Sequence, residues 1–417
     1  MLIFSSSARQ SYYRYNQASK MAVYRTILHF DLDAFFCAVE ENQNPSLRGK
    51  AFAVGGRPEE RGVVASCSYA ARKAGVRSAM PMGRALKLCP HLIIIPGHHR
   101  LYREASRQVM NIIHDVTPLV EQISIDEAFL DVTDLPDAGE QIARDLQTKI
   151  LQEFNLPCSF GIAANKLVAK IATDVGKSNA KGKGKPPSAI QVVPPGEESA
   201  FLAPLPIESL WGVGPKTASV LLDMGIRTIG DLSQLSESTL IERFGKLGYE
   251  LRLRSRGIDD RPVTVEHKIK SISQEVTFIK DVKERQTLLD TLQSLAAQVV
   301  NRMQKQHLEC TTIKLKLRWS DFSTISRQVT LPHPTDQTDI IFEQVRRLFL
   351  LVWSASVPVR LIGVGVSGLS PHQLSLWESA TETQRKERER RLNSALQELR
   401  ERYGEQIILT GGDRIED

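Results

Sequence analysis

The sequence predicts a multidomain α+β protein. At 417 residues the chain is too long for one compact core, and its length suggests about three domains. Strand-like and helix-like segments alternate in a βαββαβ-like order over residues 23–173, which is typical of an α+β sheet covered by helices on one face. A helical stretch follows over residues 205–259, and an alternating strand pattern begins after it. These changes of pattern mark the expected domain boundaries.

The composition is that of an ordinary globular protein. Hydrophobic residues make up 41% and charged residues 24% of the chain, and no apolar run approaches the ~20 residues that a membrane helix needs. The formal net charge of +6 permits a nucleic-acid partner without proving one. The five cysteines form no CxxC pair, which excludes a disulfide framework or a cysteine zinc site and favours reduced thiols in the cytoplasm.

Residues 1–20 are predicted to form a flexible N-terminal extension. They are rich in Ser, Tyr, Gln and Arg, show no periodicity and lack the apolar core of a secretory signal. Translation could instead begin at Met21, just before the first strand. The next part of the chain predicts a helix at residues 34–41, a hairpin over residues 48–64, and helices around residues 68–74 and 82–88.

The following segment continues the α+β pattern. Val109, Ile112 and Ile113 share one stripe, so residues 101–115 predict an amphipathic helix. We then expect a hairpin around residues 126–127, a helix at 139–154, a strand at 158–162, a helix at 165–173 and a basic, glycine-rich loop at 177–187. The later lysines of that loop can equally belong to a solvated linker.

Two short apolar runs contain carboxylates. Asp31 follows the run of residues 27–30, and Asp126 and Glu127 interrupt the run of residues 123–129. Ionised carboxylates are rarely buried without compensation, and divalent cations are a usual compensation. Three carboxylates from two strands can hold two Mg²⁺ ions for phosphoryl or nucleotidyl transfer. For either run alone, an acidic turn at a sheet edge is the alternative.

The helical stretch contains a glycine-rich turn between its first two helices. Gly212 and Gly214 allow a tight turn, and Pro215 suits the first turn of the next helix. A helix–hairpin–helix end of this kind binds a DNA phosphate through backbone N–H groups, with Lys216 beside it.

A basic strand face is predicted further along the chain. Lys314, Lys316 and Arg318 alternate with apolar residues, so the three cations face one side of the strand. This face suits a DNA backbone, and an ordinary solvated face is the alternative. The strand at residues 361–367 is expected in the same sheet, and residues 381–404 predict a charged helix.

Together these motifs resemble those of the Y-family translesion DNA polymerases, in particular the bacterial DNA polymerase IV branch. The resemblance covers residues 27–367. Its motifs, in order, are DLDAFFCAVE from Asp31, SYAARKAGV from Ser68, SIDEA from Ser124, GIAANK from Gly161, GVG from Gly212 and RFGK from Arg243. It implies a template-directed DNA polymerase that copies damaged templates with low fidelity.

The resemblance also implies a right-hand architecture with a further α/β domain. Its parts would be a palm at residues 21–34 and 98–195, fingers at 35–97, a thumb at 196–262, a linker at 263–273, a little finger at 274–368 and a C-terminal tail at 369–417. The implied partners are primer–template DNA and deoxynucleoside triphosphates, for a cytoplasmic protein without membrane attachment that acts as a monomer.

In the family, two metal ions lie between the carboxylates. The resemblance implies that Asp31 and Asp126 bridge both ions, that Glu127 completes the catalytic site and that the Leu32 carbonyl ligates the nucleotide-bound ion. Mg²⁺ is the implied ion, and Mn²⁺ could replace it. Asp33 would support the site from behind, and an acid at a helix N-terminus is the alternative for it.

Nucleotide contacts are implied for a second set of residues. Ser66, Tyr69 and Arg72 are three apart and would share one helix face toward the triphosphate, together with Lys177. Without the resemblance, Tyr69 and Arg72 would be read as a surface pair. The loop after Lys177 departs from the family pattern, which makes that lysine the less secure of the four.

Phe36 is expected to exclude the ribose 2′-hydroxyl as a steric gate. It follows the metal-binding Asp31 by five residues, and the family places Tyr or Phe there. Phe35 lines the same nucleotide site and is expected to pack inward. Both rings could instead belong to the core.

The tail contains a segment similar to the bacterial clamp-binding peptide. Its residues are Gln373, Leu374, Leu376 and Trp377, with Trp where Phe is commoner. The alternative is a strand-end tail that packs on its own domain.

Two rival functions fit parts of the pattern. A nucleotidyl cyclase also uses a palm-like sheet with paired acids, but needs neither the helix–hairpin–helix nor the basic strand. A catalytically idle DNA-binding or clamp-binding scaffold would not need to retain Asp31, Asp126 and Glu127 together with Tyr69 and Arg72.

Overall fold

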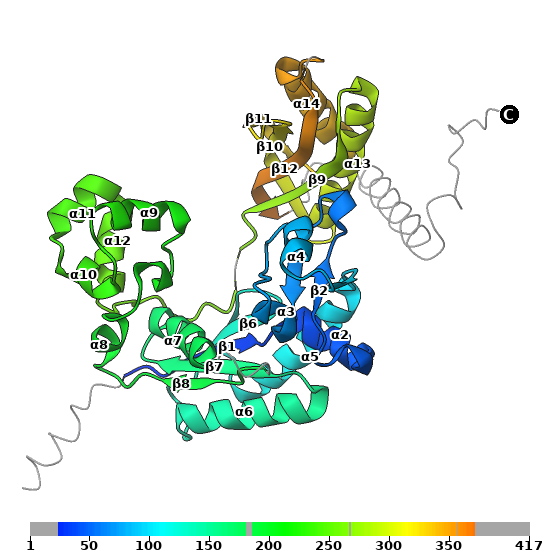
Figure 1. The fold of residues 1–417 in the computed structure, drawn as a ribbon. Helices are drawn as coiled ribbons and strands as arrows, with labels where there is room; N and C mark the ends of the chain where they lie inside the picture. Colours follow the sequence, from blue (N-terminus) through cyan, green and yellow to red (C-terminus); the bar gives the residue numbers. More distant parts are fainter. Residues whose placement is uncertain (1–23, 181–185, 267, 356, 372–417) are drawn as a thin grey trace, which may run out of the picture. The chain divides into compact units, whose positions relative to one another are not determined.

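The computed structural model describes residues 24–180, 186–266, 268–355 and 357–371. The expected N-terminal extension, residues 181–185 of the expected basic loop and the predicted clamp-binding peptide lie outside the described residues, and α7 (Lys166–Asn179) extends into the range expected for the loop. The chain forms two units, Met1–Lys268 and Ile269–Asp417 (Figure 1).

The first unit is built on a five-stranded sheet whose central strand is β1. The strand order is β5-β6-β1-β7-β8, and β1 is antiparallel to both of its neighbours. The strands are β1 (Ile27–Leu32), β5 (Val120–Gln122), β6 (Glu127–Asp131), β7 (Cys158–Ala163) and β8 (Ile190–Val192). The pairing sets Asp31 opposite Glu127, so the two acidic segments of the sequence meet at one end of β1.

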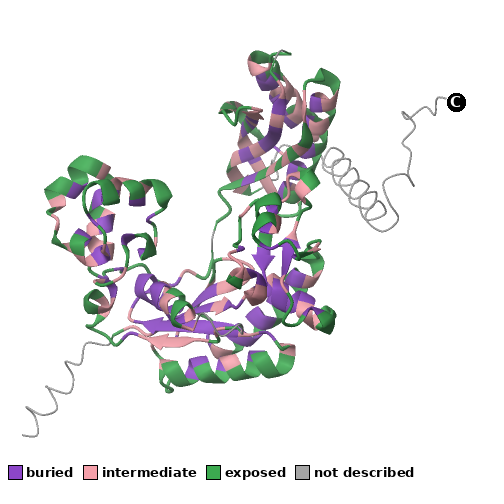
Figure 2. Cartoon of the chain, in the orientation of Figure 1, coloured by how far each residue is buried: buried purple, intermediate pink, exposed green. Residues whose placement is uncertain are grey.

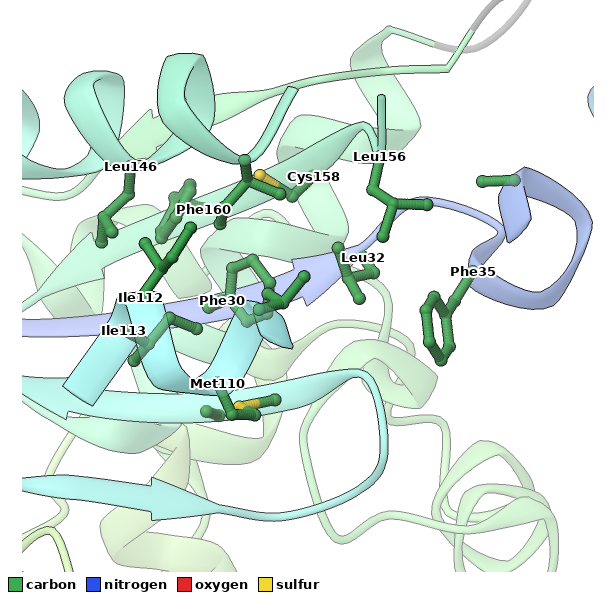
Figure 3. Close-up of a cluster of buried hydrophobic side chains, with 14 of the residues drawn as sticks. Phe30, Leu32, Phe35, Met110, Ile112, Ile113, Leu146, Leu156, Cys158 and Phe160 are labelled. Carbon is green, nitrogen blue, oxygen red and sulfur yellow. The ribbon is translucent and has the colours of Figure 1, made fainter. Parts of the chain in front are cut away.

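Helices cover both faces of this sheet. Phe30 and Phe160 pack with residues of α5 (His99–Val116) and α6 (Gly139–Phe154), as Figure 3 shows for Ile112, Ile113 and Leu146. On the other face, α7 (Lys166–Asn179) packs with Ile27 and Phe129. The expectation of helices on one face only is therefore wrong. All residues of β1 except Asp31 are buried, as in strands that are covered on both faces. Figure 2 shows buried residues concentrated in this sheet.

Gly161 allows α7 to lie close to the sheet. A Cβ at this position of β7 would lie 2.0 Å from the carbonyl oxygen of Ala169 on α7. Because Gly161 pairs with His29 in register, the same close approach brings α7 over the odd-numbered side chains of β1, including that of Asp31.

A smaller sheet follows, with strand order β3-β2-β4. Its strands are β2 (Phe52–Gly55), β3 (Val64–Cys67) and β4 (Ile93–Ile95), accompanied by α2 (Phe35–Gln43), α3 (Tyr69–Lys73) and α4 (Met82–Leu88). The predicted hairpin is confirmed, but its second strand begins at Val64 and continues to Cys67, beyond the expected range. The parallel strand β4 was not predicted.

Short helices make up the rest of the first unit and share a core of leucines and isoleucines. They are α8 (Glu198–Leu202), α9 (Pro215–Asp223), α10 (Ile229–Gln234), α11 (Glu237–Phe244) and α12 (Lys246–Ser255). The 3-10 helices of the unit are Pro45–Leu47, Pro58–Glu60 and Ile207–Ser209. Thr228 and Asp231 form a reciprocal capping box at the start of α10.

After these helices the chain returns to the edge of the five-stranded sheet. The backbone N–H of Thr264 donates to Glu121 of β5 at 2.8 Å, and Lys166 Nζ donates to the same carboxylate oxygen at 2.7 Å. Lys166 is only 4% exposed. The last segment before the second unit is therefore tied to the sheet.

The second unit is a four-stranded antiparallel sheet in the order β11-β10-β12-β9. Its elements are β9 (Ser271–Val282), α13 (Arg285–Gln304), β10 (Leu308–Trp319), β11 (Thr324–Thr335), α14 (Thr338–Val352) and β12 (Val359–Pro371). Ile313, Leu315 and Leu317 of β10 pack with both helices. The alternation predicted for this strand is confirmed, and the strand around residues 361–367 belongs to the same sheet, as expected, where it pairs with β10.

All five cysteines lie within the described residues and are buried as free thiols. None of the described helices is long and apolar enough to cross a membrane.

Candidate active site

The three predicted carboxylates come together at one end of β1 and β6. Asp31 and Glu127 are register partners, and Asp126 directly precedes β6. The Leu32 N–H donates to the Asp126 carbonyl at 3.0 Å, which fixes the backbone of both segments beside each other. The Asp126 carboxylate accepts a hydrogen bond from Ser124 Oγ at 2.5 Å.

The site makes it costly for Asp31 to be ionised without a cation. Burial raises the pKa of Asp31 to about 6; Lys177 opposes this shift, and the charges of Glu127 and Asp126 add to it. A cation beside Asp31 is therefore needed to hold its carboxylate ionised at neutral pH.

In the structure Lys177 provides that cation. Its ammonium forms ion pairs with Asp31 and, at 3.2 Å, with Asp33. Burial lowers the pKa of Lys177, but the two carboxylates more than offset this effect and raise it. Lys177, the lysine predicted to contact a triphosphate, thus pairs with Asp31 and Asp33 in the structure.

Asp33 supports the end of β1 from inside the protein. It is 1% exposed and accepts hydrogen bonds from Ser159 Oγ at 2.9 Å and from the Ser188 N–H at 2.9 Å. Asp33 lies one residue before Ala34, the N-cap residue of α2, and its side chain does not cap that helix. Asp33 instead joins β1 to β7 and to the segment before β8.

Glu127 is held by a network that was not predicted from the sequence. Lys170 donates to Glu127 and lies 3.5 Å from His29 Nε2, and His29 Nε2 lies 3.6 Å from Glu127. His29 Nδ1 contacts Thr173 Oγ1 at 2.9 Å.

The Thr173 hydroxyl orients His29. It lies 3.2 Å from each of two backbone carbonyls, which accept its single proton, so it accepts a hydrogen bond from His29 Nδ1–H. His29 Nε2 is then an acceptor that faces Lys170. Burial, followed by the charges of Lys170 and Lys177, lowers the pKa of His29 well below its usual value, so the imidazole is neutral.

The donor set fits hard divalent cations. Carboxylate oxygens and a backbone carbonyl are the ligands that Mg²⁺ prefers. Among the described residues, no group of three or more His, Cys, Asp or Glu side chains is already arranged around a metal position. Lys177 and Lys170 instead neutralise Asp31 and Glu127.

The expected helix face of Ser66, Tyr69 and Arg72 is wrong in one respect. Ser66 lies on β3, because the strand continues to Cys67 and Ser68 then caps α3. Tyr69 and Arg72 do pair on α3, with the guanidinium carbon 4.9 Å from the ring centroid. Burial, then the charge of Asp33, raises the pKa of Tyr69, and Asp31 adds to the shift.

The two phenylalanines after the first strand differ in environment. Ala34 adopts a left-handed conformation with φ of 49°, which turns the chain from β1 into α2. Phe35 is 2% exposed and belongs to the core, as expected. Phe36 is partly buried and stacks on Tyr102 of α5, with the ring centroids 4.1 Å apart.

The predicted helix–hairpin–helix turn has the required conformation. Gly212 has φ of 99°, and Pro215 is the first residue of α9. Among the described residues, no side chain caps α9, and Gly214 and Lys216 are exposed at its start. The first N–H groups of α9 are therefore available to a phosphate.

The basic residues of β10 lie on the face opposite its apolar residues. Lys314 is exposed, while Lys316 donates to Glu275 at 2.7 Å and Arg318 to Thr324 at 2.9 Å. These contacts lie on the surface of the second unit.

Family comparisons match most of the described chain. The impB/mucB/samB family matches residues 30–174, its C-terminal domain matches residues 269–376, and the HHH motif of the IMS family matches residues 195–226.

Two curated relatives carry the name DNA polymerase IV. The protein of Desulfatibacillum aliphaticivorans is 41% identical over 385 residues, which is 91% of this chain and 94% of the relative. That of Listeria monocytogenes serotype 4b (strain F2365) is 40% identical over 350 residues, covering 83% of this chain and 96% of the relative.

Solved structures agree with these relatives. The Y-family DNA polymerase chimera Dbh-Dpo4(243-245)-Dbh is 26% identical with a TM-score of 0.73, over 83% of this chain and 99% of that chain. The insertion ternary complex of Dbh DNA polymerase is 28% identical with a TM-score of 0.59, over the same shares of the two chains. The chain therefore belongs to the Y family of DNA polymerases, in the branch of the bacterial DNA polymerases IV.

Proposed function

We infer that this protein is a template-directed DNA polymerase that extends a primer 3′-hydroxyl and copies past damaged template bases. The observation that carries this function is the meeting of Asp31, Asp126 and Glu127 at the paired ends of β1 and β6, in a chain of this family. DNA and nucleotides are its substrates.

The three carboxylates and the Leu32 carbonyl are proposed to hold two Mg²⁺ ions, which Mn²⁺ could replace. When bound, the ions lower the pKa of the primer hydroxyl and neutralise the triphosphate and the departing pyrophosphate. Asp31 and Asp126 would serve both ions, and Glu127 would complete the site for the primer hydroxyl. Before the ions bind, Lys177 favours the ionised form of Asp31, and Lys170 pairs with Glu127.

Four side chains are proposed to bind the triphosphate. Arg72 offers a planar fork for two phosphate oxygens, and Tyr69 and Ser66 offer hydroxyl groups. Lys177 already binds oxygen anions at Asp31 and Asp33, and a phosphate oxygen can take the place of either carboxylate. Phe36, with Phe35 behind it, is proposed to contact the sugar and exclude a 2′-hydroxyl.

The domain assignment follows the same family. Residues 21–34 and 98–195 form the proposed palm, 35–97 the fingers, 196–262 the thumb and 274–368 the little finger. DNA-backbone contacts are proposed for Gly212, Gly214 and Lys216 of the thumb and for Lys314, Lys316 and Arg318 of the little finger.

A sliding clamp is the proposed protein partner. The peptide that would bind it, with Gln373, Leu374, Leu376 and Trp377, lies outside the described residues, so the proposal rests on the sequence. Substituting Gln373, Leu376 and Trp377 with Ala should reduce clamp-stimulated synthesis and spare unassisted synthesis. The protein is proposed to act as a monomer in the cytoplasm, where its substrates are.

Asp126→Ala tests the proposed catalytic site. It should abolish primer extension while primer–template binding stays near that of the unchanged protein, because phosphate contacts elsewhere carry the affinity. Asp131→Asn is a matched control at the other end of β6, where the carboxylate accepts hydrogen bonds from the N–H and the hydroxyl of Thr133. Near-normal extension by Asp126→Ala would disprove the assignment, and cyclic nucleotide formation from ATP without primer would favour the cyclase.

A further inference from the structure

The proposed gate Phe36 rests against a wall of aromatic rings on α5. The ring of Tyr102 is almost parallel to that of Phe36, at 13° and 4.1 Å. His99 meets both rings edge-on, at 6.2 Å from Phe36 and 5.9 Å from Tyr102. Tyr102 is fully buried, so it has no room to move toward solvent. The depth to which Phe36 can retreat therefore depends on where Tyr102 lies.

Glu40 fixes the hydroxyl end of Tyr102. Glu40 is 4% exposed, and its Oε1 accepts hydrogen bonds from the Tyr102 hydroxyl and from His98 Nδ1, the latter at 2.8 Å. Burial and the hydrogen bond to Glu40 raise the pKa of Tyr102, so the hydroxyl keeps its proton and donates.

The four residues form a closed arrangement between two helices. Phe36 and Glu40 are four apart on α2, and His98 and Tyr102 are four apart at the start of α5, so each pair shares one side of its helix. The stack of Phe36 on Tyr102 joins the two helices. One turn further along α2, Glu40 joins them again through its hydrogen bonds with Tyr102 and His98. Glu40 is thus placed to act on Phe36 through Tyr102.

A buried carboxylate is a poor means of stabilising two packed helices. An apolar side chain of similar volume at this position would stabilise the contact as well or better. A hydrogen bond to a charged acceptor does something that apolar packing does not, because it is short and directional and fixes the ring along its own plane. Stacked rings alone have no such constraint and can slide.

We propose that Glu40 is a positioning residue for sugar selection, which holds Tyr102 so that Phe36 cannot retreat from a ribonucleotide. This inference rests on the proposed role of Phe36. Glu40 acts from behind the gate, and what it controls is the resistance of the gate to displacement.

The test is the ratio of kcat/KM for a ribonucleotide to that for the matching deoxynucleotide. Glu40→Leu and Tyr102→Phe should each raise this ratio about tenfold, the effect expected of losing one hydrogen bond to a charged group. Deoxynucleotide incorporation should change less than the ratio does. Glu40→Gln retains an acceptor oxygen and should restore most of the selectivity.

Glu41→Leu is the matched control. Glu41 is the next residue on α2, is less buried than Glu40 and interacts with Arg48 instead of α5. The control should leave the ratio unchanged. If Glu40→Leu does not fold, Tyr102→Phe decides the question alone, since it removes one oxygen and keeps the ring.

Two outcomes would overturn the inference while leaving the gate assignment of Phe36 in place. One is a lower unfolding temperature in Glu40→Leu and Tyr102→Phe with an unchanged ratio, which would make Glu40 a structural tie. The other is a Glu40→Leu effect that persists in full when combined with Phe36→Val, because Glu40 would then not act through Phe36. If Phe36→Val itself leaves the ratio unchanged, the gate assignment fails and this inference fails with it. Neither failure bears on the proposal that the protein is a DNA polymerase, which Asp126→Ala tests separately.

Discussion

The cations of α7 and those of β10 use positive charge in opposite ways. Lys170 and Lys177 have side chains that are 17% and 19% exposed, and each meets a particular carboxylate of the five-stranded sheet. Lys316 is 34% exposed and pairs with a half-exposed Glu275 on a sheet surface. Buried pairs depend on the geometry of single atoms, whereas exposed pairs contribute little and are screened by salt. Catalysis is thus expected to respond to individual atoms, and DNA binding to the number of charges.

The largest expected effect comes from removing one charge from the partly buried ion pairs between α7 and the carboxylates at the end of β1 and β6. Asp31→Asn should lower kcat by about 1,000-fold, or ~4 kcal/mol, because it removes a carboxylate of the proposed metal site and leaves Lys177 paired with Asp33. Steady-state primer extension measures this change. Lys314→Gln, which changes an exposed lysine of β10, should change kcat less than twofold. A comparable loss of kcat in both variants would contradict the expected difference between the charges around Asp31 and those of β10.

The next effect concerns the backbone beneath α7. Gly161→Ala should reduce the free energy of unfolding by about 2–3 kcal/mol, because the added methyl group meets a carbonyl oxygen that the helix cannot move. Gly365→Ala on β12 is the control, since its Cβ would lie 3.3 Å from the Ser273 Cβ and 3.8 Å from the Ile272 carbonyl oxygen, without a severe clash. Urea unfolding of both variants compares the two sheets directly, and equal losses would contradict the special role given to Gly161.

A smaller effect is expected from acid. The pKa of His29 is lower in the folded protein than in the unfolded chain, where it is ~6.5. The resulting contribution to stability is therefore fully present above pH ~6.5 and is lost as the pH falls below that value, because only the unfolded chain then binds the proton readily. The urea concentration at the midpoint of unfolding should therefore decrease when the pH is lowered from 7.5 to 5.5. His29→Gln should show a smaller fall over the same range; an identical fall would assign the acid sensitivity to other groups.

The smallest effects belong to the cations of β10. We expect modestly weaker primer–template binding from each of three substitutions, Lys314→Gln, Lys316→Gln and Arg318→Gln. The slope of log Kd against log salt concentration should decrease by about one for each phosphate interaction that a substitution removes. Fluorescence anisotropy at several salt concentrations measures this slope. Lys305→Gln, in the turn after α13, is a control of equal charge. A single variant that abolished binding would indicate specific geometry on this face.

The sequence predicted the carboxylates and missed the residues that hold them. Asp31, Asp126 and Glu127 could be found because ionised groups inside apolar strands need compensation. Lys170 and His29 could not, since their importance depends on α7 lying over the odd-numbered side of β1. The signal available was the spacing of Lys170 and Lys177, seven apart on one helix, together with a histidine two residues before Asp31.

Local spacing alone also misled in two places. Ser66 fits a helix with Tyr69 and Arg72, but the strand that ends at Cys67 competes for it. The three residues of β4 are too few to give a strand pattern, and their pairing partner β2 lies about forty residues away. The first error concerns where the second strand of a local hairpin ends, and the second concerns pairing with a distant strand; periodicity reports neither.

The tie between Thr264 and Glu121 has a practical consequence for cutting the protein in two. A fragment that ended at residue 262, the boundary expected for the thumb, would remove the Thr264 N–H that donates to Glu121 of the edge strand β5. Trypsin acting at Lys268 or Lys270 would leave that tie in place. The smallest fragment that preserves the catalytic sheet therefore extends past Thr264, and limited proteolysis should yield a more soluble and durable product than a gene truncated at the domain boundary.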